Sequence, residues 1–256
     1  MDVHRQAAEI LSAYKSGDII PTLSGRDPAF DLAKAYEVES EFKRLRGVPP
    51  VGLKVGYANK AVWRALKLET LVWAHMYEDT VHDSVNEITL PYWRSPKIEP
   101  EIVFNMKQPP SGGADAATVL DSTEWIALGF EIIDSPFPDW QFKPADFVAA
   151  FGLHLGLAVG EPTQVSSHLI PSLVEQLASF KVRLLKGDTM VEEGWGKNSL
   201  RSPALCVGEL ASRTALGPGD LVSSGTLTNG QPIAQGDVWK AELEGLPLAP
   251  ITLRFA

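Results

Sequence analysis

The spacing of apolar residues changes near residue 50, and this change limits the possible folds more than any other feature of the chain. Residues 2–16 place apolar side chains on one face of a helix, and residues 29–46 repeat the pattern. Asp27-Pro28 is typical of a helix start, and Gly47 before two prolines is typical of a helix end. We therefore expect an N-terminal helical segment over residues 1–50.

After residue 50 the chain contains short β-rich runs separated by Gly, Pro and Asp. Lys186-Gly187-Asp188 and Asn229-Gly230 are turn signals, and short helices fit Lys60–Lys67 and Pro203–Arg213. The expected strands are Val51–Val55, Ile98–Met106, Trp125–Ile133, Phe147–Val159, Phe180–Leu185, Met190–Glu193, Leu221–Ser223, Val238–Leu243 and Ile251–Phe255. The pattern predicts an α+β fold, with N-terminal helices followed by a mixed, mostly antiparallel sheet domain over residues 51–256.

Composition excludes several classes of protein. The 256 residues are 45% hydrophobic and 21% charged, which suits a globular chain with a sizeable core. The net charge is −9 and no cluster of Lys and Arg stands out, so we expect no binding to nucleic acid. The longest weakly polar stretch, 147–160, is too short to span a membrane. The polar N-terminus shows no apolar targeting segment, so we expect a cytoplasmic protein with Cys206 as a small core residue.

Two apolar segments contain embedded carboxylates. Glu99 and Glu101 flank Pro100 within Ile98–Phe104, and the two-residue period of a strand places both carboxylates on one face. Glu131 is similarly embedded in apolar sequence. Like charges on a partly buried face require a compensating cation, and three carboxylates suit Mg²⁺ or Mn²⁺ better than zinc. The alternative is that these glutamates face solvent on a half-exposed sheet.

Lys54 lies in the apolar, glycine-flanked run Gly52–Gly56. Next to a carboxylate cluster and a metal, a buried lysine can exchange protons with a substrate or bind the substrate carboxylate. The alternative is an ordinary exposed lysine in a strand.

The order and spacing of these segments resemble the 2-hydroxypenta-2,4-dienoate hydratase and 4-oxalocrotonate decarboxylase family of the fumarylacetoacetate hydrolase superfamily. The resemblance covers nearly the whole chain. It is carried by Gly52–Gly56 with Asn59–Val62, by Glu99–Phe104, by Glu131–Ser135 with Asp139-Trp140, and by Ser224–Thr228 with Gly236-Asp237. It implies the β-roll of that superfamily, assembled as a homo-oligomer.

The resemblance also implies a chemistry. Glu99, Glu101 and Glu131 would hold Mg²⁺ or Mn²⁺, which would chelate a small 2-oxo acid and stabilise its enolate. Lys54 would be the proton shuttle or carboxylate clamp, and Thr226 would orient substrate oxygens. The expected activity is a metal-dependent lyase of the hydratase type. The alternatives are decarboxylation, tautomerisation or acylpyruvate-type C–C hydrolysis on the same scaffold, or a non-catalytic partner subunit.

Two segments depart from the family pattern. Ala149–His154 stands where the family has Ala-Asp-Asn-Ala-Ser-Ser, so polar groups are exchanged for apolar bulk, and Leu71–Asp79 brings a histidine at position 75. His75 and His154 are candidate acids or bases, since imidazole titrates near neutral pH. Trp73 and Phe151 are candidate substrate-binding residues. The alternative for all four is an ordinary place in the core or on the surface.

Overall fold

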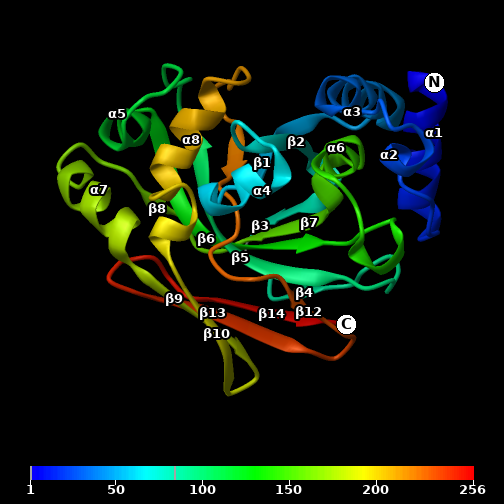
Figure 1. The fold of residues 1–256 in the computed structure, drawn as a ribbon. Helices are drawn as coiled ribbons and strands as arrows, with labels where there is room; N and C mark the ends of the chain where they lie inside the picture. The colour runs from blue at the N-terminus through cyan, green and yellow to red at the C-terminus, as the bar shows by residue number, and fades with distance from the viewer. Residues whose placement is uncertain (1, 84) are drawn as a thin grey trace.

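The fold is known from a computed structural model that describes residues 2–83 and 85–256, and it begins with three helices. The helices α1 (Val3–Ser16), α2 (Leu23–Arg26) and α3 (Leu32–Arg46) lie together on one side of the molecule (Figure 1). The carboxylate of Asp2 caps α1 by accepting hydrogen bonds from backbone N–H groups, and α1 ends at Gly17 in a left-handed conformation. Both long helices predicted from the sequence are therefore confirmed.

The start of α3 differs from the prediction by three residues. Asp31, not Asp27, is its cap, because the Asp31 carboxylate accepts a hydrogen bond from the Lys34 N–H. Asp27 instead accepts from the Ala29 N–H in a preceding turn. The predicted end at Gly47 is confirmed, since Gly47 adopts a φ of 69° directly after Arg46.

The larger of two sheets forms the centre of the molecule. Its main path is, in spatial order, β2 (Val72–Tyr77), β1 (Pro50–Gly56), β11 (Leu221–Ser223), β5 (Lys97–Met106), β6 (Thr123–Ile133), β7 (His154–Val159) and β3 (Val81–Asp83). Two further strands pair off this path, β12 (Gln231–Pro232) with β5 and β8 (Thr163–Gln164) with β6. Parallel pairs join β1 to β11 and β3 to β7, and the remaining pairs are antiparallel. This sheet is therefore mixed and mostly antiparallel.

The smaller sheet lies beneath the first in the view of Figure 1. Its strands are, in order, β10 (Thr189–Trp195), β9 (Lys181–Lys186), β13 (Val238–Glu244), β14 (Ile251–Phe255) and β4 (Glu87–Ile88). The Gly187-Asp188 turn joins β9 to β10, as the sequence predicts. The two sheets and the helices together confirm the predicted α+β class.

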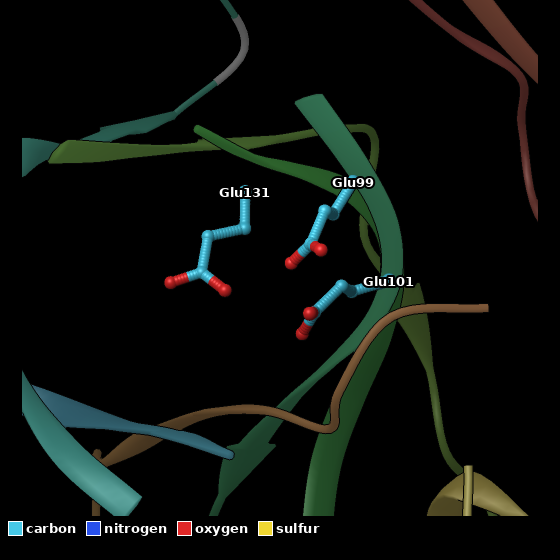
Figure 2. Close-up of side chains that lie close together, drawn as sticks. All are labelled: Glu99, Glu101 and Glu131. Atoms are coloured by element: carbon cyan, nitrogen blue, oxygen red, sulfur yellow. The ribbon is translucent and has the colours of Figure 1, made fainter. Parts of the chain in front are cut away.

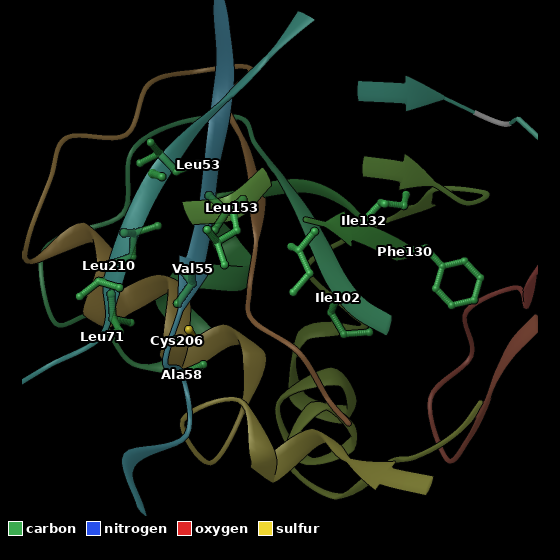
Figure 3. Packing of buried hydrophobic residues seen from close by; sticks show 14 of the residues in the cluster. Leu53, Val55, Ala58, Leu71, Ile102, Phe130, Ile132, Leu153, Cys206 and Leu210 are labelled. Atoms are coloured by element: carbon green, nitrogen blue, oxygen red, sulfur yellow. The ribbon is translucent and has the colours of Figure 1, made fainter. Parts of the chain in front are cut away.

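The remaining helices are short and cover the sheets. They are α4 (Trp63–Leu66), α5 (Ala116–Asp121), α6 (Pro144–Ala149), α7 (Ile170–Ser179) and α8 (Pro203–Ala211), with 3₁₀ turns η1 (Lys60–Val62), η2 (Glu78–Thr80), η3 (Pro138–Trp140), η4 (Phe151–Leu153) and η5 (Gly196–Asn198). Cys206 and Leu210 of α8 belong to the same buried hydrophobic cluster as Leu53 and Val55 of β1 (Figure 3). Cys206 is buried, as its apolar setting predicts.

The predicted strand Phe147–Val159 is wrong in its first half. Pro144 starts α6, where proline is favoured because its missing N–H needs no partner. The buried carboxylate of Asp146 then accepts hydrogen bonds from the Lys143 N–H and from both the N–H and the hydroxyl of Ser24. These capping bonds outweigh the β propensity of the apolar run, and the strand β7 begins only at His154.

Between α6 and β7 the backbone turns through a left-handed segment. Phe151, Gly152 and Leu153 have φ values of 42°, 67° and 60°. Glycine adopts such angles freely, but for a bulky residue they cost about 1–2 kcal/mol each. The Leu153 N–H donates to the Ala150 carbonyl, and the Leu153 carbonyl accepts from Asp134 N–H. Surrounding packing therefore has to hold this segment in place.

Within the described residues, no helix is both long and apolar enough to cross a membrane.

Candidate active site and metal centre

The register between β5 and β6 brings the three predicted glutamates together. Glu99 pairs directly with Glu131 across these strands, and Glu101 is two residues further along the same face of β5. Carboxylate oxygens of all three residues lie within 4.8 Å of one another. Figure 2 shows the three side chains pointing toward one common point.

Glu101 is fully buried and only half satisfied. Its Oε2 accepts a hydrogen bond of 2.5 Å from the Ser223 hydroxyl and one of 2.8 Å from the Gly225 N–H. Among the residues that the structure describes, its Oε1 has no hydrogen-bond partner, although it is out of contact with solvent. A buried carboxylate oxygen without a partner is costly, so this oxygen fits a cation ligand.

Electrostatics favour the same assignment. Burial, followed by the charge of Glu131, raises the pKa of Glu101 to about 8. Burial also raises the pKa of Glu99 to about 8, and the charges of Glu101 and Glu131 add to this effect. Three oxygen donors that repel one another in the absence of a cation are the ligand set of a hard divalent ion, so the residues present fit Mg²⁺ or Mn²⁺.

Lys54 lies at the edge of the carboxylate cluster, as predicted. It is 2% exposed, and its Nζ is 3.0 Å from Glu131 Oε2 and donates a 2.9 Å hydrogen bond to the Gly152 carbonyl. The ring of Phe147 lies 4.8 Å from Nζ. Burial alone would lower the pKa of Lys54, but the surrounding carboxylates, Glu131 first, outweigh it and raise the pKa. Without a bound cation, Lys54 is therefore protonated at neutral pH.

His154 contacts Glu131 from the opposite side. The pKa of the fully buried imidazole is well below its ordinary value because of burial and nearby cations, so the ring is neutral. We assign the ring proton to Nδ1, which then donates to Glu131 Oε1 over 3.0 Å. Nε2 lies 3.0 Å from the Thr80 hydroxyl and shares its proton with the Tyr77 carbonyl, which is also 3.0 Å from that hydroxyl. His154 is not among the cavity-lining residues, so the geometry fits a role in orienting Glu131 rather than contact with substrate.

A cavity of about 310 Å³ opens above Glu99 and Lys54. Its walls include Tyr57, close to Lys54 in sequence, and three aromatic side chains from one distant segment, Trp140, Phe142 and Phe147. The lining consists of Lys54, Val55, Gly56, Tyr57, Ala58, Asn59, Lys97, Glu99, Ile133, Trp140, Phe142, Phe147, Leu153, Thr226 and Gly230. Such a volume is suited to a small substrate, and Glu99 and Lys54 in its wall connect it to the carboxylate cluster.

Thr226 lines this cavity, as predicted, but its hydroxyl is engaged locally. The hydroxyl donates to the Thr228 carbonyl and accepts from the Thr228 N–H. It therefore contributes to the shape of the loop, and its proton already has an acceptor.

The structure does not bring His75 and Trp73 to the site, and here it corrects the sequence interpretation. Lys54 pairs with Ala74 across β1 and β2, so the residues on either side of Ala74 point to the opposite face. His75 Nδ1 is 2.6 Å from a carboxylate oxygen of Glu39, and the Trp73 ring packs 4.8 Å from that of Tyr36. Both residues contact α3 instead of the cavity.

Phe151 also lies away from the cavity. Its ring stacks on Phe42 of α3 at 4.3 Å and meets the edge of Tyr14 of α1 at 4.9 Å. The expectation that Phe151 binds substrate is therefore not met, because the left-handed backbone turns its side chain toward the N-terminal helices.

Sequence reasoning missed several residues that shape the site. Phe147 and Leu153 were assigned to a strand, and Ser223 and Thr80 carried no local signal that would place them beside a carboxylate. Trp140 lines the cavity, and the family motif around Asp139-Trp140 was the one available pointer to it in the sequence.

Comparisons with known proteins agree with this geometry. The chain is 27% identical over 254 residues to a 4-oxalocrotonate decarboxylase of Pseudomonas sp., covering 96% of each protein. It is 28% identical to a 2-hydroxyhexa-2,4-dienoate hydratase of Comamonas testosteroni, covering 95% of this chain and 94% of the relative.

Solved structures give the same grouping. The 4-oxalocrotonate decarboxylase from Pseudomonas putida G7, complexed with magnesium and adipate, superposes with a TM-score of 0.89 at 25% identity, covering 99% of this chain and 97% of that one. A fumarylpyruvate hydrolase from Pseudomonas aeruginosa, in complex with Mn²⁺ and pyruvate, shares the fold with a TM-score of 0.62 at 17% identity, over 82% of this chain and 90% of that one.

The fumarylacetoacetate (FAA) hydrolase C-terminal family matches residues 54–253. This range begins at Lys54 and contains the three glutamates and every strand from β2 to β13. The chain therefore belongs to the fumarylacetoacetate hydrolase family.

Proposed function

We propose that this protein is a divalent-metal-dependent lyase that acts on a small 2-oxo or 2-hydroxydienoic acid. The observation that carries the proposal is the convergence of three glutamates beside a buried lysine, with Glu99 and Lys54 lining a small, mostly apolar cavity. Relatives named as a hydratase and a decarboxylase, both matched over almost their full length, support this class of reaction.

Each group at the site has a distinct task in this proposal. Glu99, Glu101 and Glu131 would hold Mg²⁺ or Mn²⁺. When bound, the cation would withdraw electron density from the 2-oxo and carboxylate oxygens of the substrate and so stabilise negative charge on them. Lys54 Nζ would move a proton to or from the substrate carbon chain, since it is the lysine ammonium next to the cluster. His154 would keep the Glu131 carboxylate oriented.

The cavity walls suit an unsaturated carbon chain. Trp140, Phe142, Phe147 and Leu153 line the space beyond the carboxylates and would exclude water from it. Exclusion of bulk water strengthens the attraction between charged groups at the site. Hydration and hydrolysis of a C–C bond both consume water, so the cavity lining does not separate them. We favour the lyase over the hydrolase alternative because the relatives matched over almost their full length are named as a decarboxylase and a hydratase.

A second candidate is decarboxylation of a 2-oxo dicarboxylate. Lys97 lines the cavity, its Nζ lies 3.8 Å from the centre of the Trp140 ring, and no ion pair joins it to a carboxylate among the described residues. It lies on the same face of β5 as Glu99 and Glu101, by the two-residue period of the strand. A substrate with a second carboxylate would give this ammonium a partner.

The experiment that tests the proposal is turnover followed by ultraviolet absorbance. Purified protein is incubated with 2-hydroxypenta-2,4-dienoate or with 4-oxalocrotonate, either with Mg²⁺ or with a chelator. We expect Mg²⁺-dependent loss of substrate absorbance, abolished in Glu101→Gln and unchanged in the exposed control Glu175→Gln. Hydrated product identifies a hydratase, and released CO₂ identifies a decarboxylase. Equal turnover with chelator, or full activity in Glu101→Gln, would contradict the proposal.

The homo-oligomer that the family resemblance implies remains a prediction. Sedimentation velocity of the purified protein would test it, and a single monomeric species at micromolar concentration would contradict it.

A further inference from the structure

The left-handed segment Phe151–Leu153 lies directly against the lysine of the site. Bulky residues at positive φ are uncommon, and such strained conformations cluster where a fixed geometry serves function. Here two such residues, Phe151 and Leu153, flank Gly152. The Gly152 carbonyl accepts a 2.9 Å hydrogen bond from the Lys54 ammonium. The conformation of this segment therefore determines where one partner of Lys54 lies.

Gly152 also shapes the slot that holds the lysine side chain. A Cβ atom added at Gly152 would lie 2.5 Å from Lys54 Cδ and 3.1 Å from the Cβ of Ala74. Lys54 and Ala74 are paired across β1 and β2, so Gly152 covers this pair at van der Waals distance. A movement of the segment would consequently free both the stem and the ammonium of Lys54.

The ring of Phe151 anchors the segment from the other side. It lies parallel to the Phe42 ring, with 4.3 Å between centroids and 12° between planes. The Tyr14 ring meets it edge-on at 4.9 Å. Phe42 belongs to α3 and Tyr14 to α1, so both partners come from the N-terminal helices and neither lines the cavity.

We propose that Phe151 is a positioning residue for Lys54: its ring, held between Phe42 and Tyr14, keeps residues 151–153 left-handed, and the Gly152 carbonyl then fixes Lys54 Nζ beside Glu131. The N-terminal helices thereby contribute to the active site without touching the substrate. This inference rests on the proposed function, in which Lys54 transfers the proton.

The test compares two substitutions at one position, Phe151→Ala and Phe151→Asn. Both remove the ring, but asparagine tolerates left-handed backbone angles far better than alanine. We expect Phe151→Ala to lower kcat by roughly tenfold to a hundredfold, because small displacements of a catalytic group have effects of this size. We expect Phe151→Asn to recover most of this loss. The KM for substrate and the calorimetric Kd for Mg²⁺ should change little in either variant, since Glu99 and Glu101 are untouched.

Crystal structures of the variants supply a readout besides activity. The contact between Lys54 Nζ and the Gly152 carbonyl should be lost in Phe151→Ala and kept in Phe151→Asn. Leu177→Ala, at a buried position of α7 that takes no part in the site, is the control for general loss of stability and should keep the wild-type kcat. If Phe151→Ala fails to fold, Phe42→Leu removes the stacking partner instead, and we expect it to lower kcat without weakening Mg²⁺ binding.

Specific outcomes would overturn the inference. An unchanged kcat in folded Phe151→Ala or Phe42→Leu would contradict it. An equal loss of kcat in Phe151→Asn and Phe151→Ala would also contradict it, because the ring would then contribute only to packing. If the wild-type protein converts none of the 2-oxo acids with Mg²⁺, the proposed function fails. The crystal structures of the variants then remain as the test of the inference. A hydrogen bond from Lys54 to the Gly152 carbonyl that persists in Phe151→Ala would overturn it.

Discussion

Replacing Glu101 by glutamine should make the metal-free protein more stable while it removes function. The amide oxygen of glutamine can accept the same hydrogen bonds from Ser223 and Gly225 that Oε2 accepts now. The amide nitrogen would take the place of Oε1, which has no partner, and would face Glu131 as a hydrogen-bond donor. A contact that avoids repulsion only while Glu101 holds a proton would thus become a hydrogen bond that needs no bound proton.

The size of the effect follows from the pKa of Glu101, which is raised from 4.5 to about 8. A carboxyl whose pKa is higher in the folded than in the unfolded state destabilises the fold progressively as pH rises from 4.5 to 8. Below pH 4.5 the effect vanishes, because both states are protonated. The gap between 4.5 and pH 7 corresponds to on the order of 3 kcal/mol. Glutamine avoids this cost, which for a chain of this length raises the melting temperature by roughly 6–12 °C.

Differential scanning calorimetry at pH 7 and pH 5, with chelator and with Mg²⁺, measures this effect. With chelator at pH 7, Glu101→Gln should melt above wild type, and the difference should shrink at pH 5. With saturating Mg²⁺ only wild type should gain stability, by about 2.7 kcal/mol at a hundred times Kd. Glu175→Gln serves as the control. A metal-free variant that melts below wild type, or equal stabilisation of both proteins by Mg²⁺, would refute the reasoning.

Three further predictions concern the same site. Lys54→Ala should lower kcat by at least about a hundredfold and leave the calorimetric Mg²⁺ affinity nearly unchanged; an equal loss of affinity would give Lys54 a structural role. His154→Ala removes the donor that orients Glu131 and should weaken Mg²⁺ binding by roughly 10–100-fold, so unchanged affinity would exclude this support. Since the pKa values of Glu99 and Glu101 are raised to about 8, Mg²⁺ must displace protons at neutral pH. Its affinity should rise from pH 6 to pH 8, and calorimetry in buffers of different ionisation enthalpy should detect proton release; a pH-independent Kd would contradict this.

Two of the three candidate metal ligands could be predicted to lie together because strand periodicity places them locally. Glu99 and Glu101 are two residues apart in an apolar strand, so their common face follows from the pleat alone. Glu131 was a candidate from its apolar setting, but its place opposite Glu99 depends on how β5 and β6 pair, which no local pattern determines. The buried, unpaired state of Glu101 Oε1 follows from tertiary packing, which no local pattern encodes.

His75 and Trp73 show why the rest of the site could not be predicted. Both residues flank Ala74, which pairs with Lys54 in the sheet, but a strand alternates its faces, so Ala74 alone of the three shares the face of Lys54. Only the register of β1 with β2 fixes this choice, and a shift of one residue would reverse it.

Phe151 shows a different limit. Its surroundings in sequence are uniformly apolar, which favoured a strand, whereas the capping of α6 by Asp146 and the left-handed turn decide the local fold. Those features depend on Ser24 and Phe42, which are more than a hundred residues away in the chain. Local propensity therefore predicted the strand from His154 to Val159 but not the helix and the left-handed turn that precede it.

The most direct test of the central claim is anomalous diffraction from crystals of the protein soaked in Mn²⁺. The account predicts one strong anomalous peak among the carboxylates of Glu99, Glu101 and Glu131, lost in crystals of Glu101→Gln. A structure in which Mn²⁺ binds elsewhere, or in which these three carboxylates stay without a metal ion at saturating Mn²⁺, would contradict it.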